Sequence, residues 1–105
     1  MYKPILTEPA ESDIAEIVRY IAKELQNPTA AAGLLDDIEG AVASLENNPK
    51  RCALVKDDYL SGIGFRFMPV KNYLIFYIVR ENKNIVTIER VLYSRRDWLH
   101  IMSAI

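Results

Sequence analysis

The feature that most constrains this chain is the spacing of apolar residues in its first half, where two helical stripes follow each other closely. The stripes consist of Ile14, Ile17, Val18, Ile21 and Leu25, and then of Ala31, Leu34, Leu35, Ile38, Val42 and Leu45. Asn27-Pro28 between them marks a helix start, because Asn caps a helix and Pro is tolerated in its first turn. The pattern predicts two amphipathic helices joined as an αα-hairpin.

Three strand patterns fill most of the second half. Residues 63–68 alternate between apolar and more polar or smaller side chains, which is typical of a half-buried strand. Residues 73–79 are β-branched and aromatic at both parities, so both faces of that strand need cover. A polar turn over 81–84 leads to a third strand at 85–93. We expect an antiparallel meander of these three strands.

The remaining segments complete the order. Residues 2–7 predict a short first strand, which Pro4 places at a sheet edge or at a strand start. Residues 50–62 lack a period and predict a loop, and residues 95–105 predict a possible C-terminal helix. The order is therefore β-α-α-β-β-β with a possible C-terminal helix, within a single domain over 1–105. The class is α+β, with the helical hairpin packed on one face of a small antiparallel sheet.

The second face of that sheet is left open by this arrangement. The central strand is apolar there too, but the hairpin can cover only one face. Either the first strand and the last helix close off the other face, or that face is a partner-binding groove. We favour the groove.

Composition excludes several classes. Half of the 105 residues are hydrophobic and 26% are charged, which excludes intrinsic disorder. The longest uncharged apolar run, residues 73–79, is far shorter than the ~20 residues of a membrane span. A single cysteine, Cys52, excludes internal disulfides, and the N-terminus has no apolar stretch of signal-peptide length. We expect a soluble, cytoplasmic protein.

Charge is divided along the chain although the net charge is only -1. Residues 1–49 carry three bases and nine acids, whereas residues 50–105 carry ten bases and five acids. Such asymmetry is typical of a face that meets an anionic partner, or simply of a dipolar solvated surface. The sequence pI near 5.8 argues against strong nonspecific binding to nucleic acid.

Most candidate catalytic residues have a simpler structural interpretation. His100 has no second histidine with which to hold a metal, Cys52 is typical of a small buried residue, and Asp57-Asp58 of a solvated turn. We expect no metal and no organic cofactor. Arg66 and Arg90 are more informative, because an unpaired charge inside a strand is costly if it is buried.

These two arginines have three possible environments: they face solvent, pair with an acid such as Glu89, or bind a ligand. Tyr93 and Arg96 at the end of the last strand add a hydroxyl and another base. Such a cluster suits a phosphate or another anionic partner.

Several segments, in this order and spacing, resemble toxins of the RelE/ParE superfamily over nearly the whole chain. They are Asp13-Ile14, Tyr20-Ile21-Ala22, Asn27-Pro28 with Ala31-Ala32, residues 45–49, residues 64–66, residues 72–77 and residues 88–97. The resemblance implies a helical hairpin on an antiparallel sheet. It also implies a small toxin that is encoded with an antitoxin, which binds and silences it in a toxin–antitoxin hetero-oligomer.

The resemblance implies two alternative targets. RelE-like members cut messenger RNA in the ribosomal decoding site, and ParE-like members act against DNA gyrase. This chain has Leu74 where RNA-cutting members often carry Arg, and Tyr93 where they commonly carry His. We therefore rank a ParE-like gyrase toxin first and a ribosome-dependent endoribonuclease second. A toxin relic that only binds antitoxin is the third hypothesis.

If the chain is a nuclease, we expect Arg66, Arg90, Tyr93 and Arg96 to form the catalytic site. For the antitoxin we expect contact at the apolar face that carries Leu74, Phe76 and Ile78, since alternation along the strand places them side by side. The same uncovered patch would allow the free toxin to form a homo-oligomer.

Overall fold

The computed structural model describes residues 1–105. As predicted, the first half forms a helical hairpin of α1 (Glu8–Arg19) and α2 (Pro28–Ser44), and α1 continues into a π-helical segment, η1 (Tyr20–Glu24). The Thr7 and Asn27 side chains cap the two helices by accepting hydrogen bonds from the backbone N–H groups of Ala10 and Ala30. None of the helices combines the length and the apolar character that crossing a membrane requires.

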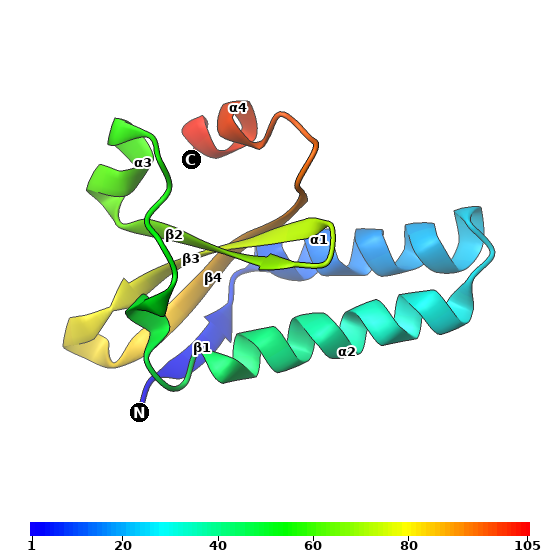
Figure 1. The fold of residues 1–105 in the computed structure, drawn as a ribbon, viewed down its shortest axis with the longest axis horizontal. Helices are drawn as coiled ribbons and strands as arrows, with labels where there is room; N and C mark the ends of the chain where they lie inside the picture. Colours follow the sequence, from blue (N-terminus) through cyan, green and yellow to red (C-terminus); the bar gives the residue numbers. More distant parts are fainter.

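The four strands form one sheet in the order β1-β4-β3-β2 (Figure 1). These are β1 (Lys3–Leu6), β2 (Phe65–Val70), β3 (Tyr73–Arg80) and β4 (Ile85–Tyr93). The predicted antiparallel meander of β2, β3 and β4 is confirmed.

The first strand differs from the antiparallel arrangement that we expected, because β1 pairs parallel to β4 and the sheet is mixed. The hairpin supplies the long connection that a parallel pair requires, since it separates β1 from the strands of the meander. Pro4 is at a sheet edge, as predicted. The amides of Lys3 and Thr7 donate hydrogen bonds on the side of β1 that faces β4. Pro4 alternates with them and faces the open edge, where its missing N–H removes no hydrogen bond of the sheet.

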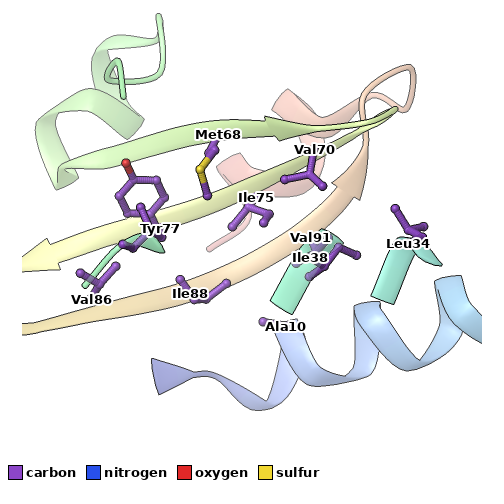
Figure 2. Packing of buried hydrophobic residues seen from close by; sticks show 11 residues of the cluster. Ala10, Leu34, Ile38, Met68, Val70, Ile75, Tyr77, Val86, Ile88 and Val91 are labelled. Atoms are coloured by element: carbon purple, nitrogen blue, oxygen red, sulfur yellow. The ribbon is translucent and has the colours of Figure 1, made fainter. Parts of the chain in front are cut away.

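One core cluster fills the space between the sheet and the hairpin (Figure 2). The hairpin contributes Ala10, Leu34 and Ile38, and the sheet contributes Met68, Val70, Ile75, Tyr77, Val86, Ile88 and Val91. The alternate residues of β3, Ile75 and Tyr77, lie on this face, as the period of two requires. This packing fixes the hairpin over one sheet face.

The segment that we expected to be a loop contains two short helical pieces. Pro49–Arg51 forms a 3-10 turn, and Asp58–Ile63 forms α3, which Asp57 caps through the backbone N–H of Leu60. A helix of six residues is too short to display a helical period, so the prediction was wrong here. The predicted C-terminal helix is present as α4 (Trp98–Ser103).

Candidate functional site

Arg66 holds a loop in place. Its guanidinium donates to the backbone carbonyls of Cys52, at 2.6 Å, and Lys50, at 3.2 Å. The same side chain lines a cleft of about 760 Å³ at the end of the sheet where the turn joins β3 to β4. The bases Lys50, Arg80 and Lys83 also line this basic cleft. Lys50 pairs there with Glu81. Arg66 therefore combines a structural role with a place in a basic cleft.

Arg90 is bound to helix α1. Its Nε and Nη2 donate to the two carboxylate oxygens of Asp13 at 2.7 and 2.9 Å, and the Val91 amide donates to the same carboxylate at 2.9 Å. The hydrogen bond with Asp13 raises the pKa of Arg90. The acid that we suggested, Glu89, instead lies 3.9 Å from Arg80. Arg90 pairs across the layers because β4 is next to α1 where β1 has ended.

Tyr93 and Arg96 lie together at the other end of the sheet. Tyr93 stands edge-on to Tyr73, with ring centroids 5.6 Å apart. Burial is the main cause that raises the pKa of Tyr73, and the nearby Tyr93 and Tyr20 raise it further. Arg96 is exposed and makes no side-chain hydrogen bond or ion pair. Of the four candidate catalytic residues, only these two line the same cavity.

The register of the sheet separates Arg66 from Tyr93. Arg66 lies opposite Tyr77, and Tyr93 lies opposite Tyr73. The two positions are four residues apart on β3, or about 13 Å, and lie on strands that flank β3, about 10 Å apart. Arg66 and Tyr93 thus belong to different ends of the sheet.

The second face of the sheet is closed, contrary to the expected groove. Phe76 and Ile78 are buried in a second core cluster, and Leu74 is half-buried against it. α3 and α4 supply the cover, with Leu60 and Met102 fully buried and Trp98 packed 5.3 Å from Phe76 between ring centroids. The last helix closes this face, as one alternative held, but its companion is α3 rather than the first strand.

The largest cavity, about 1010 Å³, is a groove on the hairpin side of the sheet, and we call it the hairpin groove. Its apolar lining comes from Ile17, Tyr20 and Leu25 of the hairpin, and from Tyr73, Val91 and Tyr93 of the sheet. Figure 1 shows why it is open: the hairpin tip extends past the end of the sheet. Tyr20 and Leu25 are therefore 54% and 56% exposed.

The sequence did not reveal the hairpin groove. Leu25 was assigned to the apolar stripe of the first helix, although the sheet is too short to cover it. Two sequence features indicate an exposed helix end: the length of that stripe, and the aromatic Tyr20 next to Ile21 of the stripe.

The other candidate residues have structural roles or surface positions. The buried Tyr77 donates its hydroxyl to the Pro49 carbonyl at 2.6 Å, and burial with the nearby Cys52 raises the pKa of Tyr77. Asp57 caps α3, and His100 is exposed on α4. No group of three or more His, Cys, Asp or Glu side chains is arranged to hold a metal ion.

The hairpin over a four-stranded mixed sheet, with two short helices on the second face, defines a small α+β fold. The family described as "ParE toxin of type II toxin-antitoxin system, parDE" matches residues 5–98. The chain therefore belongs to the ParE toxin family, and the resemblance to the RelE/ParE superfamily is confirmed. No curated protein matches the chain.

Two solved structures share the fold. A chain from the chromosomal ParDE system of P. aeruginosa is 19% identical, with a TM-score of 0.72, over 89% of this chain and 96% of that chain. A chain from the RelBE2 toxin–antitoxin complex of Mycobacterium tuberculosis is 15% identical, with a TM-score of 0.58, over 88% and 96%.

Proposed function

We propose that this chain is a toxin that arrests bacterial growth by protein contact with DNA gyrase, and that a cognate antitoxin neutralises it. The observation that carries the proposal is the separation of the candidate catalytic residues. The guanidinium group of Arg66 donates hydrogen bonds to backbone carbonyls, and that of Arg90 donates to the Asp13 carboxylate. Tyr93 lies at the other end of the sheet from Arg66. A protein-binding surface needs no cluster of catalytic residues, whereas general acid–base catalysis requires the catalytic side chains to lie within hydrogen-bond distance of the reacting group.

A supercoiling reaction with purified gyrase tests the proposal. The wild-type protein should block supercoiling, and Tyr93→Phe should block it equally, because the substitution keeps the contact with Tyr73 and removes only a hydroxyl. Intact supercoiling at a large molar excess of wild-type protein would overturn the proposal. If the protein also leaves growth unaffected in cells without antitoxin, the toxin-relic hypothesis replaces it.

A ribosome-dependent endoribonuclease is the second candidate function, and the basic cleft beside Arg66 favours it. Lys50, Arg80 and Lys83 surround that cleft and would attract a phosphate backbone. Under this alternative, Arg66→Ala removes a donor from the cleft and should lower the cleavage rate on the order of 10²–10³-fold in ribosome-programmed reactions. Unchanged messenger RNA ends with the wild-type protein would eliminate this alternative.

The predicted antitoxin contact at Leu74, Phe76 and Ile78 stays a prediction, with a new condition. Because α4 covers Phe76, an antitoxin segment can reach this face only if α4 moves away. Trp98 is the single tryptophan of the chain, so its fluorescence reports on α4 directly. A red shift of Trp98 emission on adding antitoxin would support contact at the second face, and constant emission would contradict it.

A further inference from the structure

The apolar stripes of the hairpin carry more residues than the sheet covers. Val18 and Leu35 belong to those stripes, but neither packs in one of the two core clusters. Both line a separate cavity of about 530 Å³ between α1 and α2, which we call the outer groove, and Ile14, Ala15 and Ala22 line it too. The outer groove shares no residue with the hairpin groove, so it lies on a different face of the hairpin.

Four charged side chains along the outer groove are divided between its two ends. Glu11 and Glu39 are the acids, and Arg19 and Lys23 are the bases. Because α2 runs back along α1, the two acids share the end near the sheet, and the two bases lie toward the hairpin tip. All four are exposed, and none belongs to an ion pair of the chain. The outer groove thus has an acidic and a basic end, both without a partner.

These opposite charges are too far apart to pair with each other. Glu11 and Arg19 are separated by two turns of α1, or about 12 Å along its axis. That distance exceeds both the reach of an ion pair and the screening length of about 8 Å at physiological ionic strength. A second molecule that runs in the opposite direction, however, brings its basic end against the acidic end of the first. The outer groove is therefore complementary to itself.

The size of this face agrees with a small interface. With 17 residues, α2 is about 26 Å long, and two packed helices are about 20 Å across. Each copy therefore offers roughly 500 Å², and two copies together about 1,000 Å², which is near the lower limit of a specific interface. We expect a weak dimer that dissociates on dilution.

We infer that the outer groove is the interface of a homodimer, in which α1 of a second copy of this chain packs against α1 in the opposite direction. The two-fold axis crosses the helices near Ala15 and Val18, so Glu11 of each copy meets Arg19 and Lys23 of the other. Helices that ran in the same direction would bring like charges together and repel. The inference goes beyond the proposed function and does not depend on the target of the toxin.

Sedimentation of the purified full-length chain over a range of concentrations tests for the dimer. The wild-type protein should change from monomer to dimer as its concentration rises. High salt should weaken the dimer, because the charges at its rim are exposed to solvent. A chain that stays monomeric at its highest soluble concentration would overturn the inference.

A pair of charge reversals tests the two-fold arrangement itself. Glu11→Lys places base against base at both ends of the interface, and Lys23→Glu places acid against acid, so each variant alone should dimerise at least about tenfold more weakly. A mixture of the two variants should form a dimer again. In that heterodimer, Lys at position 11 of one copy meets Glu at position 23 of the other, and the native Glu11 and Lys23 meet at the other end. Rescue on mixing is specific to this geometry.

The controls make the same charge changes outside the outer groove. Glu16→Lys lies on α1 but on the wall of the hairpin groove, and Lys56→Glu lies in the segment before α3. Both residues are exposed, so both variants should dimerise as the wild type does, alone or mixed. Dimerisation that falls equally in the controls and in the groove variants would reflect net charge rather than this interface and would contradict the inference.

A bulky side chain tests the apolar part of the interface. Ala15 and Ala30 are both exposed, but Ala15 lines the outer groove and Ala30 the hairpin groove. Ala15→Arg should abolish the dimer, whereas Ala30→Arg should leave it unchanged. Circular dichroism of each variant establishes that it is folded. A wild-type dimer that survives Ala15→Arg, or charge variants that do not recover on mixing, would place the dimer contact elsewhere.

Discussion

At the scale of single residues, one carboxylate joins the two layers. Asp13 accepts both guanidinium hydrogen bonds of Arg90 and the backbone amide of Val91. Its side chain is 11% exposed and that of Arg90 is 23% exposed, so solvent screens this pair only weakly. The ion pair thus fixes the middle of α1 against β4 beside the hairpin groove.

Asp13→Ala should therefore destabilise the fold by about 3 kcal/mol, because it leaves a mostly buried guanidinium and an amide without their acceptor. The measurement is urea unfolding followed by circular dichroism. Glu11→Ala, on an exposed position of the same helix, is the control and should change stability by less than about 0.5 kcal/mol. Equal stability of the two variants would show that the ion pair contributes nothing net.

Tyr77 makes stability depend on alkaline pH. Its pKa in the folded protein is raised above the ordinary 10.0, chiefly by burial, and that of Tyr73 is raised for the same reason. Above pH 10 the unfolded chain releases protons that the folded chain keeps, so stability is full below that pH and falls above it. For the buried Tyr77, the loss is up to about 1.4 kcal/mol per pH unit until its own folded-state pKa is reached.

Tyr77→Phe should cost about 1 kcal/mol at pH 7, because the Pro49 carbonyl loses its donor. The same variant should lose less stability than the wild type between pH 10 and 11. Thermal unfolding across this range is the measurement, and Tyr59→Phe, at an exposed tyrosine, is the comparison. Parallel pH profiles for Tyr77→Phe and the wild type would contradict the assignment.

The sequence located the charged residues that matter but not their partners. Arg66 and Arg90 were selected because a charge within a strand must be accommodated, and the structure accommodates both. Asp13 is separated from Arg90 by 77 positions in the chain, and a carbonyl such as that of Cys52 leaves no mark in the sequence. Pairing across layers follows from the tertiary arrangement, which local patterns do not contain.

At the scale of elements, Gly64 ends α3 in the left-handed conformation with φ of 106°. Its amide bonds the carbonyls of Leu60 and Ser61, so the helix end depends on this conformation. Gly64→Ala should cost about 1 kcal/mol or more, because a side chain rarely adopts this φ.

Gly62→Ala is the matched control within the same helix. Gly62 has an ordinary φ and no atom within 4 Å of an added Cβ, so alanine there should be neutral or stabilising by up to about 1 kcal/mol. The two variants are compared by urea unfolding. Similar effects of both substitutions would show that the end of α3 contributes little to the fold.

Helices long enough to repeat their apolar spacing over several turns were predictable. A short helix and a pairing between strands distant in the chain were not. Both hairpin helices were predicted from stripes of five and six apolar residues, and the second also from the Asn27-Pro28 start signal. The six residues of α3 display no period, and Leu60 packs in a core cluster with Phe76 and Met102, which are distant in the chain. The parallel pairing of β1 was missed for the same reason, since strand direction is set by the whole crossover.

At the scale of the whole molecule, the charge division of the sequence becomes a division between layers. The acidic first half builds the hairpin, and the basic second half builds three of the four strands. The hairpin groove lies where the hairpin and the sheet meet, and the basic cleft lies beside the turn that joins β3 to β4. The groove and the cleft are therefore two separate surfaces.

The choice between the two targets appears in the order in which cellular processes stop. If the toxin acts on gyrase, DNA synthesis should fall within the first minutes after induction and a DNA-damage response should follow, because replication requires continued relief of supercoils. Pulse-labelling of DNA and protein synthesis measures that order, with Tyr93→Phe expected to behave like the wild type. Protein synthesis that collapses first in the wild type would instead assign the activity to a ribosomal target.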